Sequence, residues 1–460
     1  MFGLNRQVRK LLEEQGGALR DGLSADDMSL VEVLPLAMLL KEATEADDVA
    51  GRAAGRNRSQ LRLDAAILWR EVTRRSGEVR ALSRAASAAE AALDLYGVRS
   101  AGWARARCEQ GYSALLGAEL FGDAGLLEAA EDAFRDSLSG PRRGLSAPLA
   151  EIGLLSVSGR RALVSGDAQA ARVAAARFAQ PIAALKAMSS RIRAARMLSV
   201  DGHILRAELL CEWGSRLGDA PLLRAAIRDT LTAASGLTPD FEPLTIARIG
   251  FARSRAQIAL GEVEDDAEVV IAGVNLVTGV LADLTLEHSP LDRAQGEYIL
   301  GLGQEVLGNI SGESRSFERA IDSFGRALQV ASRRDGLLLR GRAAAHRVVC
   351  LARAAEISGD VAVLNSTEKA FRLELASLSA VRDREAWALV QLNLARLLLA
   401  RLEITRKDRG ERTGARAALS SALDVLPDQG LRGLGKSAAR TLELVDSAMR
   451  ETADLKPATD

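Results

Sequence analysis

The fold is decided by the stretch Trp103-Ala-Arg-Ala-Arg-Cys-Glu-Gln-Gly-Tyr112 and, after nine residues, Gly122-Asp-Ala-Gly-Leu-Leu-Glu-Ala-Ala-Glu-Asp-Ala-Phe134. Its second part places Leu126, Ala130 and Phe134 at the spacing of three and four residues that forms one face of an amphipathic helix. Glycine provides a left-handed cap for the helix before it, and the acid that follows suits the positive N-terminus of the next helix. The stretch therefore predicts a helical hairpin.

The same Gly-acid signal recurs eight times along the 460 residues, and each time a segment with similar spacing follows it. The glycines are Gly77, Gly122, Gly166, Gly218, Gly261, Gly312, Gly359 and Gly410, and successive ones lie 43 to 52 residues apart. A period in this range is typical of repeat proteins, in which neighbouring hairpins bury one continuous core. We therefore predict an all-α solenoid of about eight antiparallel helical hairpins.

The repeat pattern also divides the chain. We expect capping helices in residues 1–54, because the ends of a solenoid core must be covered. The repeat array should occupy residues 55–430, and a last amphipathic segment, residues 431–450, reads as a C-terminal capping helix. The polar tail, residues 451–460, is predicted to be disordered.

In three repeats a further glycine lies 11 residues before the turn glycine: Gly111, Gly250 and Gly301. Glycine inside a helix costs about 1 kcal/mol relative to alanine, so these positions need a reason. The simplest is close approach of a neighbouring side chain to the helix backbone.

Several repeats resemble bacterial tetratricopeptide repeats of a lengthened kind. The resemblance rests on Trp103 to Phe134, on Trp387-Ala-Leu-Val-Gln-Leu-Asn-Leu394, and on Arg293-Ala-Gln295 through Ala320-Ile-Asp-Ser-Phe324. The units here exceed the usual length of about 34 residues, and the expected terminal proline is mostly absent. The resemblance implies a right-handed superhelix whose inner groove, lined by the first helix of each hairpin, holds a peptide or a partner helix.

If the three mid-helix glycines are equivalent, residues three before and one after each should face this groove. This nominates Cys108, Tyr112, Ala247, Phe251, Tyr298 and Leu302, with Arg105, Arg255 and Gln295 nearby. Tyrosine and arginine often supply the binding energy of an interface. The alternative is that Tyr112 and Tyr298 fill space between hairpins.

The sequence offers little catalytic chemistry. Sixty-one basic and 61 acidic residues balance, which argues against a general nucleic-acid binder. The three histidines are isolated, and the three widely spaced cysteines fit buried thiols better than disulfides or a zinc site. The acidic run Glu264-Asp-Asp-Ala-Glu268 adjoins a repeat turn and reads as a loop or helix start. We expect no enzyme, no metal and no cofactor.

The N-terminus has an amphipathic pattern. Phe2, Leu4, Val8 and Leu11 share one helical face, opposite Arg6, Arg9 and Lys10. Such a helix can contact an anionic membrane surface, dock on a partner, or serve as the first capping helix. Neither a secretory signal nor a membrane-spanning segment is recognisable, so a cytoplasmic protein is expected.

These features favour a non-enzymatic adaptor or scaffold that binds a protein or peptide segment in its concave groove, either as a helix or as an extended peptide. One alternative is a structural protein that self-assembles or is recruited to a membrane by its N-terminal helix. Another is a regulatory sensor that binds a peptide or small ligand between hairpins.

Overall fold

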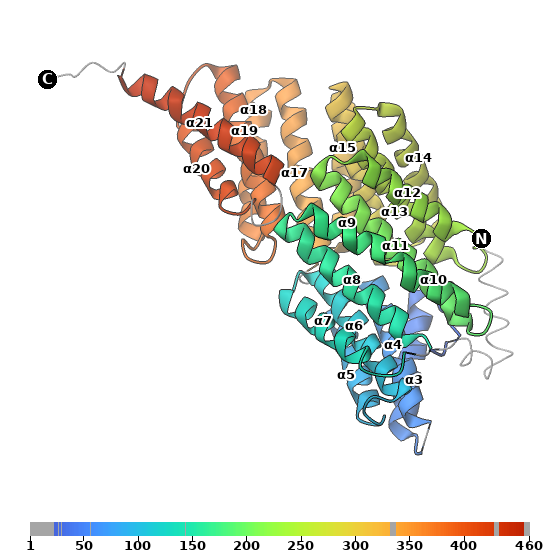
Figure 1. The fold of residues 1–460 in the computed structure, drawn as a ribbon. Helices are drawn as coiled ribbons and strands as arrows, with labels where there is room; N and C mark the ends of the chain where they lie inside the picture. Colours follow the sequence, from blue (N-terminus) through green and yellow to red (C-terminus); the bar gives the residue numbers. More distant parts are fainter. Residues whose placement is uncertain are drawn as a thin grey trace.

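The computed structural model describes residues 23–25, 27–28, 30–55, 57–142, 144–331, 337–426 and 432–454. Within these ranges the regular secondary structure is helical throughout (Figure 1). The predicted N-terminal face of Phe2, Leu4, Val8 and Leu11 lies outside the described residues, as do residues 455–460 of the predicted tail.

The described helices pair into the eight predicted hairpins. They are α4 (Arg58–Ser76) with α5 (Val79–Leu93), α6 (Ala101–Phe121) with α7 (Ala124–Ser137), α8 (Ser146–Ser165) with α9 (Ala168–Arg177) and α10 (Ala179–Met188), α11 (Arg193–Leu217) with α12 (Ala220–Ala234), α13 (Pro243–Glu264) with α14 (Ala267–Asp283), α15 (Pro290–Ser311) with α16 (Ser314–Ala331), α17 (Leu338–Ser358) with α18 (Val361–Ser377), and α19 (Arg384–Thr405) with α20 (Glu411–Leu423). The chain is thus an α-solenoid of paired helices, the architecture that the resemblance to tetratricopeptide repeats implies.

The array is flanked by further helical segments. A 3₁₀ turn, η1 (Val31–Val33), and α3 (Leu36–Arg52) precede it, and α3 packs against α4. At the other end α21 (Arg432–Asp454) packs against α20 and extends beyond the predicted boundary at residue 450.

Six of the eight predicted turn glycines end a first helix in the left-handed conformation: Gly77, Gly122, Gly166, Gly218, Gly312 and Gly359. In four of these turns an aspartate then caps the second helix with its side chain. In each case the carboxylate accepts a hydrogen bond from a first-turn N–H that has no partner within the helix; the residues are Asp123, Asp167, Asp219 and Asp360. Both residues of the signal therefore act locally, as predicted.

The prediction is wrong at Gly261 and Gly410. Gly261 is buried inside α13, which continues past it, and a Cβ atom there would lie 2.5 Å from the Val270 side chain. α13 ends instead at Asp265, and Asp266 caps α14, which confirms the acidic run as a turn and helix start. Likewise α19 ends at Arg406, and Gly410 precedes α20.

The longest repeat, between Gly166 and Gly218, contains an additional helix. Its second helix is split into α9 and α10 at Phe178. Pro181 has no N–H to donate to the preceding turn, so a continuous helix would lose a hydrogen bond there. The split adds α10, which packs against both α8 and α11.

The mid-helix glycines permit close packing, as predicted. A Cβ atom on Gly111 would lie 2.6 Å from the Phe134 ring, and one on Gly301 would lie 2.6 Å from the Phe324 ring. A Cβ atom on Gly153 of α8 would also clash with the Phe134 ring. Each of these phenylalanines is fully buried and joins its own hairpin to the next.

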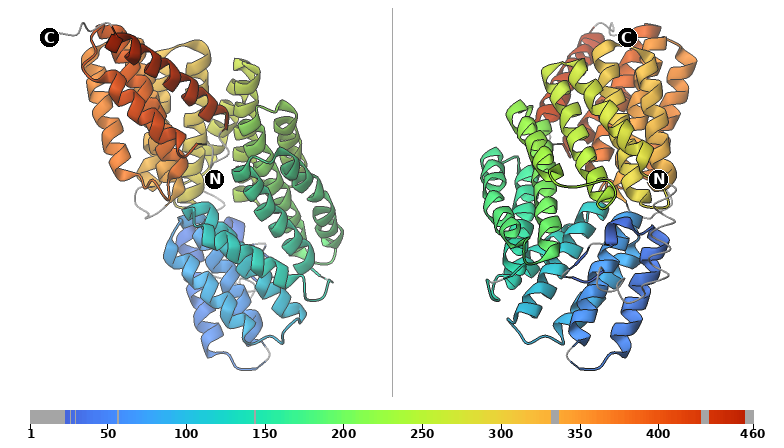
Figure 2. Two further views of the ribbon diagram at one scale, coloured as in Figure 1. Left: turned by 60° about the vertical axis from the view of Figure 1, so that its left-hand side comes forward. Right: turned by 90° about the vertical axis from the view of Figure 1, so that its right-hand side faces the viewer.

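The solenoid coils back on itself. The first hairpin contacts the sixth through α4 and α15, the second contacts the seventh through α6 and α17, and η1 contacts α13. Figure 2 shows the result, with the blue N-terminal hairpins lying beneath the yellow and orange ones. Because the superhelix returns to itself after five hairpins, part of its concave side is enclosed.

Candidate functional site

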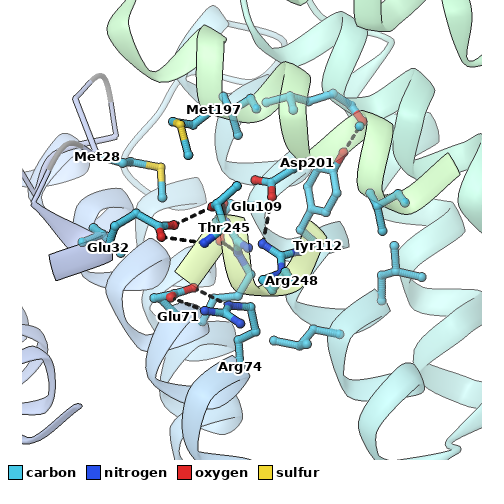
Figure 3. A pocket seen from close by; sticks show the side chains of 18 of the residues that line it. Met28, Glu32, Glu71, Arg74, Glu109, Tyr112, Met197, Asp201, Thr245 and Arg248 are labelled. Carbon is cyan, nitrogen blue, oxygen red and sulfur yellow. Dashed lines mark hydrogen bonds and ion pairs between the residues drawn. The ribbon is translucent and has the colours of Figure 1, made fainter. Parts of the chain in front are cut away.

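A cavity of about 120 Å³, partly open to solvent, lies where the first helices converge. Its wall is built from the N-terminal segment and from α4, α6, α8, α11 and α13, each the first helix of its hairpin. Figure 3 shows the labelled side chains pointing into it, among them Glu71, Glu109, Tyr112, Asp201 and Arg248. The cavity therefore lies on the side of the array that the first helices form.

A second cavity of about 410 Å³ adjoins the first. It lies between the N-terminal segment, the start of α11, and the loop before α13 that carries Phe241 and Glu242. Both cavities are lined by Met28, Glu32 and Met197. These three side chains separate the two spaces.

On α4 a buried ion-pair network forms one wall. Glu71 accepts hydrogen bonds from Arg74 at 2.8 Å and from Arg75 at 2.6 Å. Arg74 also donates to both carboxylate oxygens of Asp292 on α15, at 2.8 and 2.9 Å. Burial alone would raise the pKa of Glu71, but the two guanidinium groups hold it well below its usual range. Glu71 is therefore charged in the folded protein.

A second wall joins α4 to α6. Arg70 of α4 donates a hydrogen bond to the fully buried Glu109 of α6, and the Arg105 guanidinium lies 3.7 Å from the same carboxylate. Burial alone would lower the pKa of Arg70, but Glu109 more than compensates and raises it. The Arg70 guanidinium also lies 5.8 Å from the centre of the Tyr112 ring, a cation–π distance. This wall presents fixed charges in a sheltered site.

The third wall joins the N-terminal segment to α11 and α13. Glu32 accepts hydrogen bonds from the N–H and the hydroxyl of Thr245, both at 2.8 Å. Arg248 donates to Asp201 at 2.9 Å. Burial, and then the neighbouring Glu71 charge, raises the pKa of Glu32 above its usual value. The Glu32 carboxylate is thus enclosed at the N-terminus of α13, where backbone N–H groups are free to bind it.

Two of the residues predicted to line the groove, Arg105 and Tyr112, do line this cavity. Cys108 and Phe251 are instead buried in the core, 0% and 4% exposed. The Phe251 ring packs so closely against Gly296 that a Cβ atom on this glycine would lie 2.6 Å from it. A position three before or one after a glycine therefore does not by itself identify a groove residue, because first helices are covered on several sides.

Arg255, Gln295 and Tyr298 lie on α13 and α15, outside the linings of both cavities. Arg255 pairs with Glu212 of α11. The Tyr298 ring packs 5.8 Å from Phe324, as the Tyr112 ring packs 5.1 Å from Phe134. The alternative interpretation of the two tyrosines, as residues that fill space between hairpins, matches these contacts.

Several polar residues of the cavity were missed from the sequence, above all Glu32, Glu71, Arg74, Asp201 and Arg248. A signal for most of them exists. First helices are buried between neighbours, so charged residues that recur every three or four positions along such a helix mark its groove side. Glu32 carries no such signal, since its segment precedes the repeats.

His346 on α17 provides a titration test of the contact between two neighbouring hairpins, because Glu305 lies on α15. Its Nδ1 lies 2.7 Å from the Glu305 carboxylate. Burial alone lowers the pKa of His346, but the Glu305 charge and hydrogen bond raise it above 6.5. The stability that this pair contributes is therefore fully present below pH 6.5 and is lost as the pH rises through the higher, folded-state pKa. We expect the NMR titration of His346 to have its midpoint above 6.5.

The control is Glu305→Gln, which should lower the His346 midpoint, because it removes the charge that most strongly opposes burial and leaves only Glu385 and Glu262 to raise the pKa. His288 serves as an internal reference, since burial lowers its pKa to about 4. A midpoint of His346 that is unchanged in Glu305→Gln would show that the pair does not form in solution.

The three cysteines are free and buried, as predicted. Burial raises the pKa of Cys108 to about 12 and that of Cys211 to about 11. Thiols of this kind are unreactive at neutral pH. Within the described ranges no group of three or more His, Cys, Asp and Glu side chains has the arrangement of a metal site.

No described helix is both long and apolar enough to cross a lipid bilayer.

No family model matches the sequence, and no curated protein is similar to it. Solved structures give distant matches. A Rap protein complexed with competence and sporulation factor is 11% identical, with 91% of this chain and 99% of that chain covered and a TM-score of 0.39. A circular tandem repeat protein is 17% identical (98% and 94% covered, TM-score 0.26), and yeast Tom70 is 10% identical (89% and 96% covered, TM-score 0.29). These TM-scores are too low to support a fold assignment, which therefore rests on the helix pairing described above.

Proposed function

We propose that this chain is a non-enzymatic protein-binding scaffold that takes up an extended segment of a partner in its enclosed inner groove. The observation that carries the proposal is the pair of adjoining cavities on the concave side, walled by consecutive first helices. Ligand sites are typically concave, with a few fixed polar groups among apolar ones. Here the ion pairs of Arg70 and Arg248 supply the polar groups, and Met28, Met197 and Leu205 supply the apolar surface.

The size of the cavities favours an extended segment over a helix. An α-helix with its side chains is about 10–12 Å wide. Cavities of about 120 and 410 Å³ suit a narrower, extended segment better than a helix of this width. An extended segment can instead pass from the larger cavity toward the smaller one, with its backbone groups bound by the charged side chains of the wall.

The test is to fill the boundary between the two cavities. Met197→Trp adds an indole where both linings meet, and the matched control Leu231→Trp adds the same group on the outer helix α12, where Leu231 is 51% exposed. Affinity purification from the native cells, quantified by mass spectrometry, should show at least a tenfold loss of a partner with Met197→Trp and no loss with Leu231→Trp. Circular dichroism should show equal helix content in the two variants.

Equal recovery of every partner by the two variants would place binding elsewhere on the molecule. Recovery of this chain alone, in both variants and in the unmodified protein, would favour the self-assembling alternative.

A further inference from the structure

The seam at which the coil closes is held by a short segment that we call the latch, residues 30–36. Glu32 of the latch binds Thr245 of α13, and the Leu36 N–H donates to the Glu287 carbonyl at 3.1 Å. The His288 Nε2 lies 2.8 Å from the Glu32 carbonyl. These contacts join residues more than 200 positions apart, so they are separate from the packing of neighbouring hairpins.

The latch is attached to its own end of the chain by apolar packing. Val31 and Leu34 are buried with Leu39 of α3 and with Leu68 and Trp69 of α4. Among the described residues, that hydrophobic cluster contains no side chain of α13 or α15. Across the seam the specific contacts of the latch are the hydrogen bonds of Glu32 and Leu36 and that of His288 to Glu32.

Next to the latch, the Arg74–Asp292 ion pair joins α4 to α15 across the same seam. Ser289 donates to the same carboxylate at 2.6 Å. The contacts of the latch can be released at modest cost, because their polar groups exchange protein partners for water. Elsewhere the closure is partly apolar, since Leu120 and Phe121 of α6 pack against the cluster that contains α15 and α17 residues. Opening hairpins from one another would instead expose fully buried side chains such as Phe134 and Phe324.

The latch also forms the wall of the proposed binding site. Glu32 lines both cavities, together with Met28 just before the latch and Met197 of α11. Figure 3 shows Glu32 bound to Thr245, with the two methionines beside it. Moving Glu32 away would merge the two spaces and expose the groove along the seam.

We propose that the latch controls access to the inner groove: it opens by releasing Thr245 and Glu287, admits a ligand, and closes over it. This regulation rests on the proposed function of the groove. The opening itself needs no partner, so it can be measured on the protein alone.

The experiment uses an engineered thiol inside the smaller cavity, Leu205→Cys, in the full chain. The three native thiols are buried, so the new one is the reactive site. The probes are a small and a bulky maleimide. In the otherwise unchanged chain the bulky reagent should react much more slowly than the small one. Adding Glu32→Ala should raise the rate of the bulky reagent at least tenfold.

The matched control is Glu119→Ala in the same background. Glu119 lines the same cavity, but it pairs with Arg160 of the neighbouring hairpin and not across the seam. It should leave the labelling rates unchanged. Equal rates for Glu32→Ala and Glu119→Ala would overturn the proposal. So would labelling of the native cysteines in Glu32→Ala, because the segment would then be a structural support and not a latch.

A second measurement needs no substitution. In hydrogen–deuterium exchange of the unmodified chain, the amides of Leu36 and Thr245 should exchange at least tenfold faster than amides in the middle of α4 and α13. Equal protection at the seam and in the helix cores would mean that the latch opens only on global unfolding, which overturns the proposal. Neither measurement involves a ligand, so a latch that opens while Met197→Trp leaves partner recovery unchanged would refute the proposed function alone.

Discussion

Replacing Glu71 with alanine is expected to destabilise the protein by about 3–5 kcal/mol, the range for breaking a buried ion pair from one side. Glu71 is 8% exposed, and its carboxylate serves Arg74 and the fully buried Arg75. Without it Arg75 keeps only backbone partners, the carbonyls of Val31 and Leu34. Guanidinium denaturation followed by circular dichroism would measure the loss as a lower midpoint.

Two comparisons distinguish the loss of this buried ion pair from the effect of removing any glutamate side chain. Glu45→Ala removes the same side chain from an exposed pair with Lys41, and should change stability by less than about 1 kcal/mol.

The second comparison is the dependence of the stability difference on pH. Because the folded-state pKa of Glu71 is lowered, its contribution is present above the usual value of 4.5 and is lost as the pH falls through the folded-state pKa. The difference between Glu71→Ala and the unmodified protein should therefore shrink in acid. A difference that stays constant between pH 7 and pH 3 would contradict a charged Glu71.

Phe134→Ala should be equally costly, at about 3–5 kcal/mol, the range for removing a buried phenylalanine. The ring is fully buried, contacts Tyr112 edge-on at 5.1 Å, and lies against Gly111 of its own hairpin and Gly153 of the next. Its loss removes contacts within one hairpin and between two. The matched control is Phe241→Ala, since Phe241 is 69% exposed, and it should shift the denaturation midpoint little.

A double variant tests the glycine–phenylalanine packing directly. In the unmodified protein, Gly111→Ala forces a Cβ atom to within 2.6 Å of the Phe134 ring, so it should destabilise. In Phe134→Ala the space is empty, and the same substitution should stabilise by up to about 1 kcal/mol, the helix-propensity gain of alanine over glycine. The same sign in both backgrounds would show that the contact does not limit this position.

The local features of the repeat were predictable because each depends on residues close in sequence. The hairpin predicted from the stretch Trp103 to Phe134 corresponds to α6 (Ala101–Phe121) and α7 (Ala124–Ser137). The caps follow from single Gly-Asp pairs. The prediction failed at Gly261 and Gly410, where Asp265 and Arg406 take the left-handed conformation that ends the first helix, although neither is a glycine.

The candidate site was only partly predictable. Of the residues nominated around Gly111, Arg105 and Tyr112 line the smaller cavity. The same rule also selected the core residues Cys108 and Phe251, since spacing along one helix does not say which side a neighbour covers. Arg74 and Glu32 were missed because their partners, Asp292 and Thr245, lie 218 and 213 positions away.

The sequence alone determined that this chain is a solenoid of eight helical hairpins, because a hairpin is specified by the caps, glycines and apolar spacing within about 50 residues. Only the tertiary structure decided that the solenoid closes on itself and encloses a groove. That closure depends on small rotations between successive hairpins, which add up along the array until the first hairpin meets the sixth. No single repeat records this sum, so the cavity and its latch become visible only once the hairpins are stacked.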